Sequence, residues 1–439
     1  MNRRELLKRA AQWAAFMTVA RSGEAQITAM DARVRGTARA CVFFYLNGAP
    51  SHVDTFDVKD GPWNPRDANI QQYHGGIALS TTMFPRLSQM TGDLCILRSV
   101  RSWEAAHDRG VFYTQTAHPS NPAFIVETPH MGAVVASEKA TDAPMPAFLL
   151  LDSGGTAAQG AAFLGGSASP MRASANQSIV QTMEHNYFGT DSPRRFEERF
   201  AMLRDLDSSL LAKTQDRAIS NHGAYYDSAK RLMYDPGIAS VFRLNPQEKD
   251  RYGDTNIGRS ANIASNAIRI NNGAIYVALS QGGWDTHQNM FDRNYAGNMY
   301  TMTRDLDAAV ASLVEDLRAS GDLDKTLIVI MGEFGRTPGA LNSQGGRDHH
   351  RDAMSVVMIG GGVAGGRVIG STDSIGRLVA DPGWSAQRPV VMEDIASTIY
   401  SAMGIDWTKS LYDTPSGRRF EYVPGAARAA YTSIDEVFR

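Results

Sequence analysis

The chain has little cysteine, no large excess of charge and no long hydrophobic run. Only two cysteines, Cys41 and Cys95, occur in 439 residues, which excludes a disulfide scaffold and any cysteine-rich zinc or iron–sulfur site. Both lie in apolar runs, so we expect buried thiols rather than a disulfide. Forty-four basic and 46 acidic side chains leave a formal charge of −2, so no strong positive field is present to collect nucleic acid.

Residues 1–25 have the pattern of an export signal. The chain opens with MNRRELLKR, and an apolar run follows over residues 11–20. This run is about half of the ~20 residues needed to span a bilayer, which fits a secretory signal and not a transmembrane helix. Arg3 and Arg4 ahead of two leucines resemble the twin-arginine signal, a receptor-read address. We therefore expect a periplasmic or secreted protein, the alternative being an ordinary basic amphipathic helix.

The remaining chain, residues 26–439, reads as alternating strands and helices. Continuous apolar runs rich in β-formers predict strands buried on both faces, at residues 40–46, 94–100, 148–151, 274–279, 326–331 and 355–359. Apolar residues at helical spacing predict helices over 306–317, ended by Gly321, and over 394–402. The order predicts an open α/β sheet covered by helices. Residues 155–270, which are rich in small and polar residues, are expected to form an insertion or cap.

Acidic residues and histidines gather where these strands end. Strand 274–279 leads into GGWDTH at 282–287, strand 326–331 into GEFGRTP at 332–338, and GRDHH at 346–350 precedes strand 355–359. The first strand leads into NGAPSHVDTFD at 47–57. Ligands of open α/β sheets bind outside the carboxyl ends of the strands, so we expect these loops to meet.

Carboxylates and imidazoles without a thiolate suit a divalent cation: zinc, manganese, magnesium or calcium. Each group of residues also has a structural interpretation. Asp285 and His287 would then cap the next helix, and Glu333 with Arg336 would be an ion pair. Asp54 with Asp57 would be turn residues. Asp348 and His349 are harder to explain in this way.

These motifs, in this order, resemble the DUF1501 family of exported bacterial proteins, and the match continues into GGGVAGG at 360–366. That family resembles a distant branch of the alkaline phosphatase and sulfatase superfamily. The resemblance implies a three-layer α/β/α sandwich, alkaline phosphatase-like, with a helical or loop insertion and a metal site at the strand ends. It also implies roles for single residues. The expected metal ligands are Asp54, Asp285, His287, Glu333 and His349, with Asp348 as a further ligand or an orienting partner.

Two departures from the superfamily pattern bear on the chemistry. Phe334 takes the place of the histidine of a second metal, and Asn47 stands where many relatives have an aspartate, which favours one ion or a weak second. The region of the superfamily's nucleophile matches WEAAHDRG at 103–110, which has no hydroxyl or thiol. Superfamily hydrolases attack with a Ser, Thr or Cys.

The leading hypothesis is an exported metal-dependent hydrolase of small phosphate or sulfate esters. A metal-activated water or an unidentified nucleophile would attack, with His107 as acid or base and Arg109 or Arg336 pairing with the anion. The alternative, favoured by the absent nucleophile, is a non-catalytic metal-binding protein that serves as a binding or assembly partner in the cell envelope.

Overall fold

The structure is a computed structural model that describes residues 32–141, 143–151, 160–175, 192–211, 230, 236–270 and 273–439. The expected export signal at 1–25 lies outside the described residues, as does part of the expected insertion. Within the described ranges, no helix combines the length and hydrophobicity needed to cross a bilayer.

An eight-stranded sheet forms the centre of the molecule, in the order β12-β4-β11-β8-β1-β7-β5-β6. Its strands are β1 (Ala40–Leu46), β4 (Cys95–Val100), β5 (Phe148–Leu151), β6 (Met171–Ala173), β7 (Tyr276–Gln281), β8 (Thr326–Met331), β11 (Met354–Ile359) and β12 (Arg367–Ile369). The sheet is mixed, because β11 runs antiparallel to both β4 and β8. The strands around β1, namely β8, β7, β5 and β6, run parallel.

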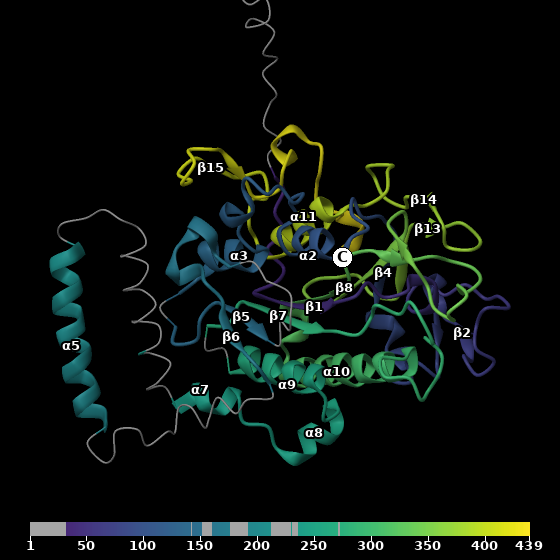
Figure 1. The fold of residues 1–439 in the computed structure, drawn as a ribbon, viewed down its shortest axis with the longest axis horizontal. Coiled ribbons are helices and arrows are strands. Elements are labelled where there is room, and N and C mark those ends of the chain that lie inside the picture. Colours follow the sequence, from purple (N-terminus) through teal and green to yellow (C-terminus); the bar gives the residue numbers. More distant parts are fainter. Residues whose placement is uncertain are drawn as a thin grey trace, which may run out of the picture.

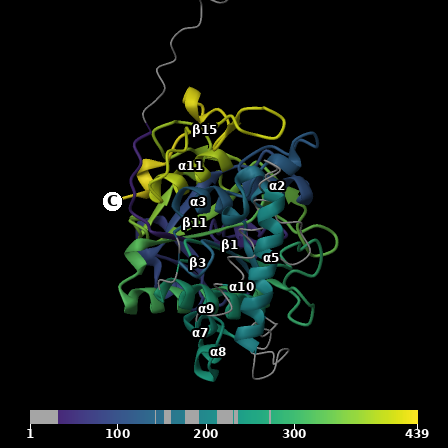
Figure 2. The ribbon, with the colours of Figure 1, turned by 90° about the vertical axis from the view of Figure 1, so that its left-hand side faces the viewer.

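Helices cover both faces of the sheet and complete the expected three-layer α/β/α sandwich. Helices α2 (His107–Thr116), α3 (Met131–Lys139) and α11 (Met392–Ala402) lie on one face, and α9 (Asn256–Arg269) and α10 (Met299–Ser320) lie on the other (Figures 1 and 2). Alternation along β1 explains both layers. Cys41, Phe43 and Tyr45 point into one hydrophobic core, and the intervening residues of the strand point into the other. Cys41 and Cys95 are buried and free, as expected.

Helix α10 ends at the predicted glycine but begins at Met299, well before the predicted start at residue 306. Asn298 caps α10 by accepting from the Thr301 N–H at 3.0 Å, and Gly321 ends the helix in the left-handed conformation at φ 77°. Strand β7 starts two residues later than expected and continues to Gln281, because its pairing with β1 holds through the Leu46–Gln281 partners.

Two described elements of the region 155–270, which was expected to form an insertion or cap, belong to the central sandwich. Strand β6 pairs with β5 as the edge of the central sheet, and α9 packs along α10. These two elements belong to the sandwich itself, which differs from the expected boundary. Helix α5 (Ser192–Leu211) lies apart from the sheet in Figure 1, and α7 (Pro236–Val241) and α8 (Pro246–Tyr252) lie beside α9.

Short hairpins complete the fold. Their strands are β2 (Ile70–Gln72) with β3 (Ala78–Ser80), β9 (Gly335–Arg336) with β10 (His349–His350), β13 (Ser371–Thr372) with β14 (Val379–Asp381), and β15 (Ser410–Leu411) with β16 (Phe420–Glu421). The β9–β10 pair matters most for the site, because it joins the segment after β8 to the segment before β11.

Candidate metal centre

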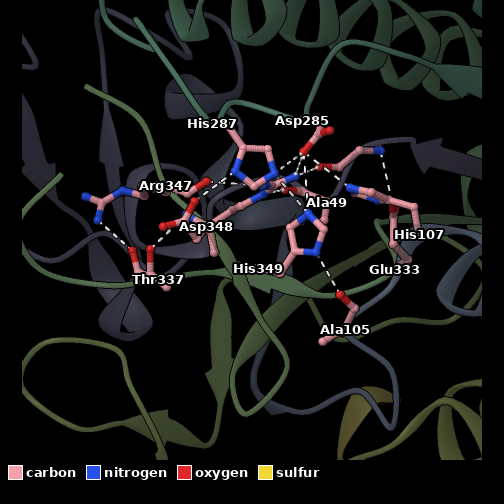
Figure 3. Close-up of polar contacts among 12 residues, drawn as sticks. Ala49, Ala105, His107, Asp285, His287, Glu333, Thr337, Arg347, Asp348 and His349 are labelled. Carbon is pink, nitrogen blue, oxygen red and sulfur yellow. Dashed lines mark hydrogen bonds and ion pairs between the residues drawn. The ribbon is translucent and has the colours of Figure 1, made fainter. Parts of the chain in front are cut away.

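Four donor side chains meet beyond the carboxyl ends of the parallel strands (Figure 3). Asp285 and His287 come from the loop after β7, His349 from β10, and His107 from the first residue of α2. One ligand atom of each lies within 4.8 Å of every other. The structure thus brings three of the expected metal ligands together, and adds His107, for which a catalytic role was expected.

The ligand atoms approach a common point. The Nε2 atoms of His287 and His349 are 3.1 Å apart. Asp285 Oδ1 lies 3.0 Å from His287 Nε2, 3.2 Å from His107 Nε2 and 3.7 Å from His349 Nε2. No thiolate takes part, so the donors are three imidazole nitrogens and one carboxylate.

The other ring nitrogen of each histidine faces an oxygen that can only accept. His107 Nδ1 lies 2.6 Å from Glu333 Oε1, and His287 Nδ1 lies 2.9 Å from Asp348 Oδ1. His349 Nδ1 lies 2.7 Å from the carbonyl oxygen of Ala105. Each Nδ1 therefore carries the proton, which leaves three Nε2 lone pairs directed at the same place.

This donor set fits a divalent cation. Three imidazole nitrogens and one carboxylate oxygen this close together are donors that a single divalent cation could share. His107 Nε2 is buried and has no hydrogen bond from any described residue. Histidine ligands of metals commonly donate their second N–H to a carboxylate or carbonyl, which is the arrangement present at all three histidines. Nitrogen and oxygen donors in this combination suit zinc or manganese best.

A buried guanidinium borders the cluster. Arg336, on β9, donates from Nη2 to Asp285 Oδ1 at 2.5 Å, and its Nη1 lies 3.2 Å from His287 Nε2. Its Nε donates to the Ala49 carbonyl at 2.9 Å, its Nη2 to the Gly48 carbonyl and its Nη1 to that of Arg347. With a side chain 0% exposed, Arg336 is a fixed positive charge inside the site.

The charges around the cluster shift its pKa values. Burial raises the pKa of Asp285, but the hydrogen bond and charge of Arg336 outweigh it and the net shift is downward. The hydrogen bond to Glu333 raises the pKa of His107. Burial lowers the pKa of His349, and the nearby charge of Arg336 adds to the effect. The hydrogen bond from His287 lowers the pKa of Asp348.

Glu333 lies outside the ligand cluster, which differs from its expected ligand role. Its side chain is 0% exposed and turns inward. It accepts from the Tyr45 hydroxyl at 2.8 Å, from the Gly48 N–H at 3.1 Å and from His107. Because His107 stands between Glu333 and the other donors, this carboxylate orients a ligand. Asp348 was expected to be either a ligand or an orienting partner, and it orients His287 in the same way.

Asp54 is also separated from the cluster, and its expected role as a ligand needs correction. It lies in a short 3-10 helix after β1, where Arg347 donates to its two oxygens from Nε at 2.7 Å and Nη2 at 3.2 Å. Ser51 donates to the same carboxylate at 2.5 Å. Both charged side chains are at most 1% exposed, so this bidentate pair ties the loop after β1 to the loop that carries Asp348.

Of the three residues expected to act in catalysis, His107 and Arg336 lie at the cluster and Arg109 does not. Arg109 lies on the exposed side of α2 and donates to Glu104 at 2.7 Å, with 58% of its side chain exposed. The hydroxyls nearest to the expected nucleophile position are inside the protein: Ser99, Ser102 and Thr114 are each at most 2% exposed. Phe334 packs its ring 5.0 Å from that of His107 and 4.8 Å from that of His349, which makes this side of the cluster apolar.

The model of one protein family matches residues 38–430, under the description "Protein of unknown function (DUF1501)". The chain belongs to the DUF1501 family. No curated protein matches this DUF1501 chain.

Several solved structures share parts of the fold. Ps i-CgsB, determined in complex with k-i-k-neocarrahexaose, matches with a TM-score of 0.42 and 10% identity, over 84% of this chain and 72% of its own. The lipoteichoic acid synthase LtaP from Listeria monocytogenes gives 0.39 and 10%, over 86% and 76%. The PsFucS1 sulfatase from Pseudoalteromonas sp. gives 0.38 and 12%, over 84% and 68%. With TM-scores below 0.5, these similarities say nothing about activity.

Proposed function

We propose that this DUF1501 protein is a metal-dependent hydrolase of phosphate or sulfate esters. The proposal rests on one observation: three imidazole Nε2 atoms and the Asp285 carboxylate lie around a common point, and the Nδ1 of each histidine donates to an acceptor. His107, His287, His349 and Asp285 would hold the ion. A divalent cation in such a site polarises an ester oxygen and lowers the pKa of a water molecule.

The chain's own groups suit an anionic substrate. Arg336 is held by backbone carbonyls and Asp285, so its charge stays in place while a substrate enters. A fixed cation in a partly enclosed site attracts anions and stabilises charge that develops on them. Half of the Asp285 side chain and about a third of that of His287 remain exposed, so the cluster opens to solvent on that side.

Water is the proposed nucleophile. The serine and threonine hydroxyls closest in sequence to the expected position are buried, and Ser102 Oγ accepts from the Glu104 N–H at 3.2 Å. None of these three hydroxyls is exposed to meet a substrate at the open side of the cluster. Arg336 would then act on the substrate through its charge, because its N–H groups are already bonded to backbone carbonyls, Asp285 and His287.

The experiment measures metal and turnover together. Purified protein is analysed for bound metals, and is then assayed with p-nitrophenyl phosphate and p-nitrophenyl sulfate in the presence of zinc or manganese. We expect about one ion per chain and hydrolysis of one of the two esters, both lost in His349→Ala. Bound metal without turnover of any ester would contradict the proposal and support the non-catalytic envelope protein.

We also propose that residues 1–25 export the chain by the twin-arginine route to the periplasm or medium. The support is the Arg3-Arg4 pair ahead of a short apolar run. Fusion of these residues to a reporter that needs export in the folded state tests this. We expect export of the reporter, and its loss when both arginines are replaced by lysine. Equal export by the lysine variant would contradict it.

A further inference from the structure

An exposed aromatic residue lies close in sequence to a backbone group that contacts the metal centre. Trp103 is 44% exposed, whereas most large apolar side chains of the described residues are buried. It lies two residues before Ala105, whose carbonyl oxygen accepts from His349 Nδ1 at 2.7 Å. Two residues span at most about 7 Å of chain, so the backbone of Trp103 lies near the segment that contacts His349.

The position of Trp103 is fixed from several sides. Arg101 places its guanidinium carbon 5.6 Å from the centre of the indole ring, and Arg351 Nη1 donates to the Trp103 carbonyl at 3.4 Å. The backbone is held as well, because the Ser102 N–H donates to the Arg351 carbonyl at 2.8 Å. The Trp103 side chain also lies beside the buried carboxyl of Glu393.

One guanidinium near Trp103 has no carboxylate partner in the part of the chain that the structure describes, whereas the other two are paired. Arg101 lies 3.5 Å from Asp352, and Arg109 is bonded to Glu104. Arg351 is exposed, and no carboxylate among the described residues lies within ion-pair distance of it. The platform, defined as Trp103 with Arg101 and Arg351, thus combines an exposed aromatic ring with the guanidinium of Arg351, which has no carboxylate partner among the described residues.

We propose that this platform binds the alcohol half of the ester, with the flat face of a sugar or aromatic ring stacked on Trp103 and the ester group directed at the metal centre. The inference rests on the proposed function and adds a substrate class to it: ring-bearing anionic esters. An exposed apolar surface that is held rigid beside a reactive site stabilises a ring at small entropic cost. Arg351 favours rings that carry a further anionic group.

The test uses phosphonates, whose carbon–phosphorus bond is not an ester and is not hydrolysed. Zinc-loaded protein is titrated calorimetrically with methylphosphonate, phenylphosphonate and the phosphonate analogue of glucose 6-phosphate. Trp103→Ala should weaken binding of a ring-bearing ligand about ten-fold and leave that of methylphosphonate within about two-fold. Trp103→Phe should keep most of the ring affinity. The ligand whose affinity falls in Trp103→Ala, phenylphosphonate or the sugar phosphonate, shows whether the platform binds an aromatic ring or a sugar ring.

Controls separate this inference from the proposed function. Zinc content should be equal in wild type and Trp103→Ala, and Tyr412→Ala, which removes an aromatic side chain that is 69% exposed elsewhere, should change no affinity. Unchanged ring affinity in Trp103→Ala, with zinc and methylphosphonate still bound, would overturn the platform alone. A wild-type protein that binds zinc but none of the three ligands, and that hydrolyses neither p-nitrophenyl ester, would overturn the proposed function, and the platform with it.

Discussion

The Nε2 atoms of His287 and His349 face each other at 3.1 Å, and neither carries the proton of its ring. Asp348 and the Ala105 carbonyl hold those protons on the far side of each imidazole. Arg336 Nη1 reaches the lone pair of His287 at 3.2 Å, but the buried Nε2 of His107 has no hydrogen bond from any described residue. These nitrogens, together with the Asp285 carboxylate, could hold a divalent cation.

Removal of a ligand should empty the site. His287→Ala and His349→Ala each delete one of the convergent Nε2 atoms, and we expect each variant to retain little metal after dialysis, as measured by elemental analysis. His74→Ala is the matched control, since His74 is exposed and lies in the hairpin between β2 and β3. Equal metal content in all three variants would rule out these ligands.

Asp348 should matter for affinity without being a ligand. Asp348→Ala leaves His287 Nδ1 without its acceptor, so the ring loses its fixed orientation and tautomer. We expect metal affinity to fall by about 10- to 100-fold, measured by competition with a chelator. Asp352→Ala, which removes a nearby carboxylate bonded to Arg101, should leave the affinity unchanged, and a similar fall in both variants would argue against orientation by Asp348.

Asp54 should stabilise the fold rather than bind metal. Asp54→Ala leaves the buried guanidinium of Arg347 without its carboxylate, and we expect the free energy of unfolding to fall by about 3–5 kcal/mol. Denaturant unfolding measures this. Asp93→Ala breaks an exposed pair with Arg318 and should cost less than about 1 kcal/mol. If metal content fell in Asp54→Ala protein that was still folded, Asp54 would belong to the site after all.

Glu393 should make stability depend on pH. Burial raises its pKa from 4.5 to about 7, although the hydrogen bond from Tyr113 opposes this. As pH rises from 4.5 to 7, the unfolded chain loses this proton while the folded chain keeps it, so the wild type loses stability. Glu393→Gln has no such proton to lose. Its free energy of unfolding, relative to that of the wild type, should therefore rise by roughly 3 kcal/mol between pH 4.5 and 8.

Unfolding by denaturant at several pH values checks this. Glu198→Gln serves as the control, because the Glu198 side chain is 58% exposed on α5. The difference in unfolding free energy between this variant and the wild type should not change with pH. A flat difference for Glu393→Gln as well would show that the carboxyl ionises in the folded protein as it does in the unfolded chain.

Local sequence patterns predicted the fold well where the signal was an apolar run. The buried strands at 40–46 and 326–331 lie where they were expected, because a strand covered on both faces needs apolar residues at every position. The direction of β11 and the membership of α9 in the sandwich were not readable from periodicity. Both depend on which partner each element meets in space, which no short window contains.

The sequence by itself determined which loops carry the chemistry, since acidic residues and histidines follow the strands of a parallel sheet and the carboxyl ends of those strands meet. Only the tertiary structure decided the role of each side chain. His107 joins the donors from the first turn of α2, while Glu333 lies behind it and Asp54 is bonded to Arg347. The reason is physical: whether a carboxylate meets a metal, a histidine or an arginine depends on distances of a few ångströms between segments far apart in the chain.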